Sequence, residues 1–242
     1  MPNYRYAIVV GASSGIGAEI VRQLAKQGCR VAAVARRADR LNGLASEFPT
    51  LVFPFEHDVT HYDEVPRLFQ NITGQLGGLD LIIYAAGVMP AVGASEFDFA
   101  KDREMIDVNL LGAIAWLDQA AVRFQNTKSG SIVGIGSVAG DRGRVGQPVY
   151  NTSKAALATY LEALRNRLCR HGVKVVTIKP GPTATEMTAH LHSSGMMPAS
   201  DVASFVIRKS GRTGEHYVKF THRLAFFIIR HFPSWLFRKL SV

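Results

Sequence analysis

Short apolar runs alternate along the chain with longer stretches in which apolar residues recur every three or four positions. The runs are rich in valine, isoleucine and leucine, a pattern typical of strands buried on both faces, and the stretches between them have the period of amphipathic helices. The predicted strands lie at 6–10, 31–34, 51–53, 79–84, 131–135 and 173–178. The alternation predicts an α/β fold: a doubly wound parallel sheet covered by helices on both faces, in three layers.

The length and composition favour one domain. A chain of 242 residues, of which 47% are hydrophobic, can build one large core, and single α/β domains commonly reach this size. The sequence contains no internal repeat, low-complexity tract or linker. We therefore expect a single domain over residues 1–220 and treat residues 221–242, which differ in composition, as a C-terminal tail.

A glycine-rich turn follows the first predicted strand. Gly11, Gly15 and Gly17 lie between that strand and a helical pattern, with the spacing GxxxGxG. Glycines let the backbone approach a pyrophosphate closely, and the amino end of a helix presents unpaired amides to it. The spacing differs from the GxGxxG of the dinucleotide fingerprint, and a purely structural turn would account for three glycines equally well. The turn by itself therefore indicates a dinucleotide site without deciding it.

A tyrosine and a lysine, Tyr150 and Lys154, stand four residues apart, and Ser137 precedes the tyrosine by thirteen. On a helix these two positions share a face, and an ammonium beside a phenol favours the ionised phenol. At about 4 Å and an effective dielectric of about 20, the attraction reaches about 4 kcal/mol, or about three pK units. We expect Lys154 to lower the pKa of Tyr150 and to make the phenol a usable acid. An exposed helix face would explain the pair if it stood alone.

Taken in order, these motifs resemble the short-chain dehydrogenase/reductase family from about Tyr4 to about Thr185. The resemblance implies a Rossmann fold and an oxidoreductase that uses NAD(P). The positions that match the family's motifs are Gly11, Gly15 and Gly17 for the cofactor glycines, Asp58 and Val59 for the adenine side, Asn109, Ser137, Tyr150 and Lys154 for catalysis, and Pro180, Gly181 and Thr185 for the nicotinamide segment. The match also places Ser13, Ser14, Ile16, Ala85, Ala86, Gly87 and Thr183 at the cofactor.

One motif departs from the family's pattern. Where the family usually has an asparagine before the small residues that follow its fourth strand, this chain has Tyr84, followed by Ala85, Ala86 and Gly87. The asparagine normally braces the sheet through its side chain. We expect altered packing around Tyr84 and unchanged chemistry.

The resemblance implies a role for each catalytic residue. Hydride passes from C4 of NADPH to a carbonyl carbon, while the oxygen meets Ser137 and a proton from Tyr150, the general acid. Lys154 holds the ribose of the nicotinamide, and Asn109 supports a water that connects Lys154 to solvent. In the reverse direction Tyr150 acts as a base on a secondary alcohol.

The cofactor preference depends on the residues after the second predicted strand. An acid about 20 positions beyond the glycine turn would bond a ribose 2′-hydroxyl, whereas an arginine accommodates a 2′-phosphate. This chain has Arg36 and Arg37 there, and Asp39 is the first acid nearby. We expect Arg36, with help from Arg37 and Ser13, to select NADP(H) over NAD(H). The alternative is a pair of solvated arginines at the start of a helix.

The region from 183 to 200 is the expected substrate lid. Its apolar and imidazole groups suit a partly apolar ketone, and the residues we expect to form it are Met187, His190, Leu191 and Met196. His190 and His192 have no third ligand in view, so we expect no metal site.

Two other functions stay open: an NAD-dependent secondary-alcohol dehydrogenase, and a non-catalytic NADP(H)-binding sensor or interaction protein. The four catalytic residues argue against a sensor, which would need no proton donor.

The formal net charge is +9, and much of the excess lies near the end of the chain, where eight lysines and arginines after residue 207 accompany one acid, Glu215. Large apolar residues are interleaved with these cations, as in helices that lie at a membrane surface. The alternative is that they dock on the domain or on a second subunit. We keep membrane contact through 224–240 and docking as alternatives. We expect no nucleic-acid partner, because no reader motif accompanies the charge.

The remaining features concern location and assembly. Cys29 and Cys169 are too few and too dispersed for a disulfide framework, which suits the cytoplasm. We expect no secretory signal and no membrane span, because the longest apolar run near the end, 224–229, has six residues against the roughly 20 needed. The family resemblance implies a homodimer or homotetramer, packed through helices near 98–125 and 148–171.

Overall fold

Seven parallel strands form the central sheet of the protein, in the order β3-β2-β1-β4-β5-β6-β9. The computed structural model describes residues 3–93, 95–189 and 195–239. The strands are β1 (Tyr6–Val10), β2 (Arg30–Ala35), β3 (Val52–Glu56), β4 (Leu81–Tyr84), β5 (Ser131–Ile135), β6 (Lys174–Lys179) and β9 (Gly214–Tyr217). A separate parallel pair joins β7 (Thr183–Ala184) to β8 (Met197–Pro198).

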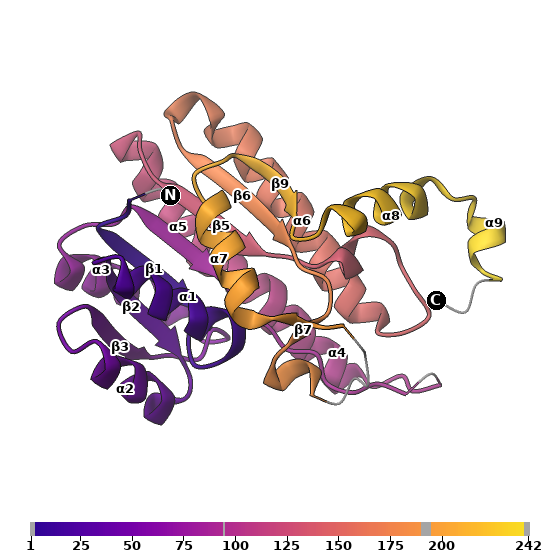
Figure 1. Ribbon diagram of the computed structural model, residues 1–242, viewed down its shortest axis with the longest axis horizontal. Coiled ribbons are helices and arrows are strands. Elements are labelled where there is room, and N and C mark those ends of the chain that lie inside the picture. Colours follow the sequence, from indigo (N-terminus) through magenta and orange to yellow (C-terminus); the bar gives the residue numbers. More distant parts are fainter. Residues whose placement is uncertain (1–2, 94, 190–194, 240–242) are drawn as a thin grey trace.

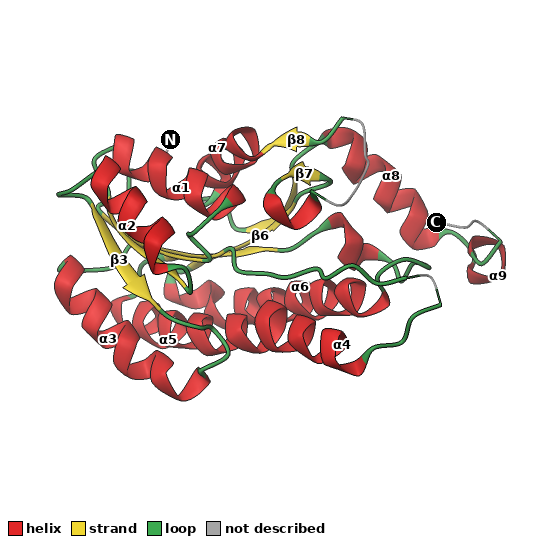
Figure 2. Ribbon diagram, turned by 90° about the horizontal axis from the view of Figure 1, so that it is seen from below, coloured by secondary structure: helices red, strands yellow, loops and turns green. Residues whose placement is uncertain are grey.

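Helices cover both faces of this sheet, which is seen nearly edge-on between them in Figure 2. One layer contains α1 (Gly15–Lys26), α2 (Ala38–Glu47) and α7 (Ala199–Lys209). The other contains α3 (Val65–Leu76), α4 (Phe99–Ile106), α5 (Gly112–Thr127) and α6 (Pro148–Leu168). The predicted fold class, a single three-layer domain with a doubly wound parallel sheet, is confirmed.

The two layers have separate cores because side chains alternate across each strand. In β1, Val9 joins the cluster beneath α1 and α7, whereas Ile8 joins the cluster beneath α3, α5 and α6. Ile83 and Ile82 of β4 divide in the same way. All four side chains are fully buried, so each strand needs apolar residues on both faces and appears in the sequence as an unbroken apolar run.

The sequence pattern misses the last strand of the sheet. Strand β9 has the sequence Gly-Glu-His-Tyr and lies at the sheet edge, where it pairs with β6 only. An edge strand is half-exposed, so it tolerates polar residues and gives no apolar run. The opposite edge, β3, carries Pro54, which an edge strand also accommodates.

Tyr84 braces the sheet in its own way. Its side chain is buried, and its hydroxyl donates a hydrogen bond of 2.6 Å to the carbonyl of Val108. Val108 lies in a turn of π-helix, Asp107–Leu111, that joins α4 to α5. The phenol therefore ties the end of β4 to this turn.

The continuous helix from Phe99 to Thr127 is long and apolar enough to cross a membrane by length and composition alone. Length and composition alone do not distinguish such a segment from the core helix of a folded domain. Half of its most apolar window is buried inside the domain, where Trp116 and Phe124 are fully buried. Its apolar character is accounted for by its place in the layer below the sheet.

The C-terminal tail forms two helices, α8 (Phe220–His231) and α9 (Ser234–Phe237), which extend past the end of the sheet in Figure 1. Arg142 holds them: its Nη1 donates to the carbonyls of Ile229 (2.9 Å), Arg230 (3.1 Å) and Phe232 (2.8 Å). The last carbonyls of a helix lack partners within it, and a cation also suits the negative end of the helix dipole.

A buried carboxylate provides the second attachment of the tail. The Asp141 side chain is fully buried and pairs with both Lys179 of β6 and Arg230 of α8. Tyr217 of β9 donates to the same carboxylate at 2.9 Å. Asp141 closes the 3-10 helix Val138–Asp141, immediately after Ser137. The tail is therefore tied to the loop that carries a predicted catalytic residue.

Part of the apolar surface of the tail stays exposed. Five large apolar residues of this region are more than half exposed: Phe220, Leu224, Phe227, Ile228 and Trp235. These five side chains therefore do not dock on the domain, whereas Phe226, Phe232, Leu236 and Phe237 are partly buried. Docking on a second subunit stays an alternative for the exposed group. Two charged contacts attach the tail. Arg142 of the domain donates to carbonyls at the end of α8, and Arg230 of α8 pairs with Asp141 of the domain.

Replacing Arg142 with alanine should loosen the tail while leaving the sheet intact. A charged donor that satisfies several carbonyls contributes about 2 kcal/mol, so the amides of α8 should exchange with solvent about 30-fold faster. Hydrogen exchange with mass spectrometry, resolved to peptides of α8 and of β1, measures this. The matched control is Arg223→Ala, an exposed arginine of α8. Equal exchange in α8 for wild type and Arg142→Ala would contradict the attachment.

Candidate functional site

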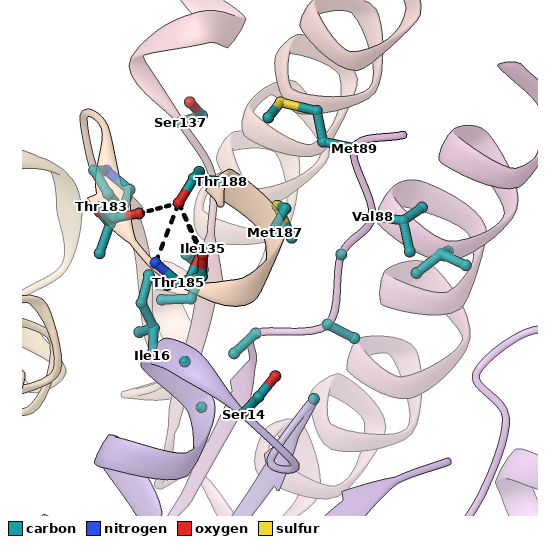
Figure 3. Close-up of a pocket in the computed structure, with 18 of the residues that line it drawn as sticks. Ser14, Ile16, Val88, Met89, Ile135, Ser137, Thr183, Thr185, Met187 and Thr188 are labelled. Carbon is teal, nitrogen blue, oxygen red and sulfur yellow. Dashed lines mark hydrogen bonds between the residues drawn. The ribbon is translucent and has the colours of Figure 1, made fainter. Parts of the chain in front are cut away.

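A cavity of about 360 Å³ opens at the edge of the sheet where the strands end. The carboxyl ends of parallel strands meet at one edge, so the loops after β1, β2, β4, β5 and β6 all reach it. Figure 3 shows residues of these loops around the cavity, among them Ser14, Val88 and Ser137. The sheet topology alone thus brings together motifs that are more than a hundred residues apart in the chain.

The glycine turn packs so tightly that side chains are excluded from it. Gly11 has φ of +89°, and a Cβ on it would lie 2.3 Å from the backbone nitrogen of Ala86. A Cβ on Gly17 would lie 2.1 Å from the carbonyl oxygen of Gly11. The first turn of α1 therefore lies directly against the loops after β1 and β4. Its free amides face the cavity, as an anion site requires.

The two arginines after β2 occupy different places. Arg37 crosses the glycine turn, where its guanidinium donates to Ser13 Oγ (3.1 Å) and Ser14 Oγ (2.7 Å). It also pairs with Glu186 at 2.7 Å. Arg36 points toward Asp58, with its Nη1 at 3.7 Å from a carboxylate oxygen. Both line the cavity, but Arg37, which we expected only to assist, contacts the glycine turn.

Asp58 and Val59, the pair expected on the adenine side, lie differently with respect to the cavity. Val59 lines the cavity, whereas Asp58 is not among its lining residues. The Asp58 carboxylate accepts hydrogen bonds from the backbone nitrogen and hydroxyl of Thr60. Burial acts to raise the pKa of Asp58, but these hydrogen bonds and Arg36 outweigh it and hold the pKa below its ordinary value. His57, which sequence reasoning missed, is buried and lines the cavity beside Val59.

Ser137, Tyr150 and Lys154 converge on one wall of the cavity. Ser137 follows β5 and begins the 3-10 helix, and its hydroxyl accepts a hydrogen bond of 3.0 Å from the backbone nitrogen of Ala139. The other two lie one turn apart on α6. Lys154 is buried, and its ammonium donates to the carbonyl of Ile135 at 3.0 Å.

Burial controls the proton affinity of this pair. It lowers the pKa of Lys154 to about 8 and raises that of Tyr150 above its ordinary value, although the Ser137 hydroxyl and the Arg144 guanidinium act to lower it. The expectation that Lys154 makes the pKa of Tyr150 low is wrong here. The ammonium is directed at the Ile135 carbonyl and lies 5.8 Å from the centre of the phenol ring, so desolvation of the phenol prevails.

Asn109 fixes the loop after β4. Its side-chain nitrogen donates to the carbonyl of Val88 (3.0 Å) and to Ser153 Oγ (3.1 Å), and its oxygen accepts from the nitrogen of Val88 (2.7 Å). The residue is fully buried in the π-helical turn and is not among the cavity's lining residues. Its amide thus joins α6 to the loop that carries the small residues Ala85, Ala86 and Gly87.

The segment after β6 folds over the cavity mouth. Pro180, Gly181, Thr183 and Thr185, which we expected beside the cofactor, all line the cavity. Thr188 holds the segment: its hydroxyl donates to the carbonyl of Thr183 at 2.6 Å and accepts from the nitrogen of Thr185 at 3.1 Å, as Figure 3 shows.

The predicted lid residues have different outcomes. Met187 lines the cavity, and Met196 is partly buried without lining it. His190 and Leu191 lie outside the described residues. Among the lining residues that sequence reasoning missed are Met89 and Arg144. No motif marks them, because each reaches the cavity from a loop whose path depends on the fold.

Comparison with known proteins identifies the family. Residues 5–194 match the family model described as short chain dehydrogenase. An uncharacterised oxidoreductase of Myxococcus xanthus is 39% identical over 190 residues, which cover 77% of this chain and 75% of that protein. An uncharacterised oxidoreductase of Mycobacterium tuberculosis is 33% identical over 196 residues, which cover 78% of each. The chain belongs to the short-chain dehydrogenase/reductase family.

Solved structures share the fold of this short-chain dehydrogenase. A short chain dehydrogenase from Burkholderia cenocepacia in complex with NADP superposes with a TM-score of 0.85 at 23% identity, covering 100% of both chains. ElxO with NADP bound gives a TM-score of 0.82 at 20% identity, covering 91% of this chain and 99% of the other. At these identities the likeness shows the fold. The family match ends at residue 194, so α7, β9 and the tail lie beyond it.

Lys154 should make the stability of this short-chain dehydrogenase rise with pH. Its pKa is about 8 in the folded protein against 10.5, so between these values the unfolded chain binds more protons and unfolding becomes less favourable as pH rises. Between pH 8 and 10 this adds about 2 kcal/mol. Urea unfolding of wild type and Lys154→Met across this range isolates the effect, because other groups titrate equally in both. A constant difference between the two proteins would contradict a buried, desolvated ammonium.

Proposed function

We propose that this short-chain dehydrogenase is an NADP(H)-dependent carbonyl reductase that acts on a partly apolar ketone, with Tyr150 as the general acid. The observation that carries the proposal is the convergence of Ser137, Tyr150 and Lys154 on one wall of the cavity that the glycine turn, Arg36 and Arg37 enclose. A phosphate-binding turn and a proton donor therefore share one space.

The residues present suit a phosphorylated dinucleotide. The amides that begin α1 and the close approach of Gly11 provide for the pyrophosphate. Arg36 and Arg37 would hold the 2′-phosphate, with Arg37 already in contact with Ser13 and Ser14. NADP in the Burkholderia cenocepacia structure and in ElxO supports this preference. Val59 would contact the adenine side, and Thr185 the nicotinamide end.

The cofactor would supply hydride, and the protein the proton. Tyr150 has a raised pKa and is therefore protonated at neutral pH, as a general acid must be. Ser137 would meet the carbonyl oxygen beside it. Lys154, whose pKa is lowered to about 8, is poised to return a proton to the phenol. Asn109 would act by holding the loop after β4, and the water we assigned to it stays part of the proposal.

Exposed apolar side chains bear on how the protein assembles. Phe97, Phe99, Leu111 and Val122, on or just before α4 and α5, are large apolar side chains that are exposed. They support a homodimer or homotetramer that packs through these helices and α6. The cytoplasm stays the proposed location. The residues from 183 to 200 would close over the substrate, and residues 221–242 would form a separate tail.

A nicotinamide fluorescence titration combined with a carbonyl assay tests this function. NADPH should bind more tightly than NADH, and Arg37→Ala should weaken NADPH binding about 10- to 100-fold while leaving NADH unchanged. Arg36→Ala should act in the same direction. Tyr150→Phe should keep NADPH binding within about threefold and lower ketone reduction at least about 100-fold, the usual contribution of a general acid.

The matched control is Arg67→Ala, an exposed arginine of α3 away from the cavity, which should behave as wild type. Equal or tighter binding of NADH would favour the NAD-dependent secondary-alcohol dehydrogenase. NADPH binding without turnover of any ketone or alcohol in the panel would favour the non-catalytic sensor.

We also propose that the exposed face of α8 contacts a membrane surface. Phe220, Leu224, Phe227 and Ile228 have the spacing of one helical face and are exposed. In the described part of the chain, Lys219, Arg223, Arg238 and Lys239 have no acidic partner, so cations border the apolar face. An anionic lipid surface complements both features.

Cosedimentation with vesicles tests the membrane contact. Wild type should bind vesicles of phosphatidylcholine with phosphatidylserine, and bind vesicles of phosphatidylcholine alone more weakly. Serine at Leu224, Phe227 and Ile228 together should weaken binding at least about tenfold, because three apolar side chains would no longer be buried. The control carries serine at Val145, which is exposed elsewhere. Wild type that stays in the supernatant, or loss of a dimer by the triple variant in light scattering, would contradict the membrane proposal.

A further inference from the structure

Arg144 is a cation in the cavity that has no acidic partner in the described part of the chain. It stands in the loop between Ser137 and Tyr150 and is partly buried. Its Nε is buried without a hydrogen-bond partner, and its Nη2 makes one long contact, 3.4 Å, with Asn151 Oδ1. Burial lowers the pKa of the guanidinium. A desolvated cation without a counter-charge is costly.

The other end of the cavity has its own cations, so the cofactor does not account for Arg144. Arg36 and Arg37 follow β2, whereas Arg144 belongs to the loop between β5 and α6. The positive charge of Arg144 acts to lower the pKa of Tyr150, which places it near the phenol. The cation therefore lies on the side of the cavity where the proton donor stands.

The loop that carries Arg144 is held in a fixed shape. Gln147 has φ of +59°, an uncommon backbone conformation for a residue other than glycine. Its side-chain nitrogen donates to the carbonyl of Pro90 at 3.1 Å, and Asn151 donates to the carbonyl of Gly146 at 3.0 Å. These contacts tie both sides of the loop, so the guanidinium is presented from a braced position.

The guanidinium of Arg144 keeps donors that are not used within the protein. The same chain shows the pairing in Arg22, whose Nε and Nη2 donate to the two carboxylate oxygens of Glu47 at 2.8 Å each. In Arg144 the corresponding Nε is buried and has no hydrogen-bond partner, and Nη2 makes only the long contact. A fork of two parallel donors binds carboxylate and phosphate better than a neutral group.

We infer that Arg144 binds an anionic group of the substrate, so that this short-chain dehydrogenase reduces an oxo acid, a ketone that also carries a carboxylate. This inference rests on the proposed reductase function. Val88, Met89 and Met187 line the same cavity and suit an apolar chain attached to the acid. Hydride adds to the carbonyl carbon, Tyr150 gives its proton to the oxygen, and the products are a hydroxy acid and the oxidised cofactor.

Matched pairs of substrates test the inference. The panel consists of aromatic ketones with a carboxylate at the 2-, 3- or 4-position, the methyl ester of each, and phosphonate analogues. For wild type, kcat/KM should be higher for the acid than for its ester in at least one pair. Arg144→Gln should lower kcat/KM for that acid about 10- to 100-fold, the contribution of a charge-assisted pair, and change that for the ester by less than about threefold.

Two variants serve as controls. Arg144→Lys keeps the charge without the fork and should recover part of the loss, whereas Arg67→Gln removes an exposed arginine and should change nothing. In Arg144→Gln the pKa that governs ester reduction should rise, because the cation beside Tyr150 is gone. A phosphonate that outperforms its carboxylate would assign the site to phosphorylated substrates and overturn the oxo-acid form.

The outcomes separate this inference from the reductase function. Equal kcat/KM for acids and esters in wild type, with both lost in Tyr150→Phe, would keep the reductase and overturn the anion site. If nothing in the panel is reduced, calorimetric binding of the acids to the NADP⁺-loaded protein still decides the role of Arg144. Tighter binding of acid than ester that is lost in Arg144→Gln would support the site, and equal binding would overturn it.

Discussion

The close approach of two strand ends governs the rest of this structure. The loops after β1 and β4 touch at Gly11 and Ala86, where no side chain larger than hydrogen fits on the glycine. This contact lets α1 begin directly against the sheet edge, and it fixes where its free amides point. The loop after β4 is held from the other side by Asn109. The floor of the cavity is therefore set by backbone packing before any catalytic side chain is placed.

Buried charges in this protein fall into two groups. Asp141 and Lys179 are both buried, and they satisfy each other together with Tyr217, Glu215 and Arg230. Such a network holds structure because removing one partner would leave the others uncompensated. Lys154 and Arg144 lack a carboxylate partner among the described residues. Desolvated cations of this kind mark functional sites, and both lie in the cavity.

The charge network around Asp141 also links the tail to the wall of the cavity that carries Ser137. Asp141 is the last residue of the 3-10 helix that Ser137 begins, and Arg142 follows it. Both residues contact α8. A Cβ on Gly181 would lie 2.1 Å from the ring of His222 in α8, so α8 also packs against the segment after β6. The tail is thus in contact with two of the loops that shape the cavity, although the family match does not reach it.

The sequence by itself determined most of the sheet and the motif positions that meet at one edge of it. Strands β1, β2, β4, β5 and β6 are apolar on both faces because both faces are buried, and the motif residues follow those strands because parallel strands end at one edge. Only the tertiary structure decided that β9 completes the sheet, that Arg37 lies over the glycine turn, that burial overrides Lys154 in setting the pKa of Tyr150, and that Arg144 enters the cavity. A hydrophobic pattern records how deeply each position is buried. It contains no record of which charged groups share a desolvated space, and that pairing depends on where loops from distant parts of the chain come to lie.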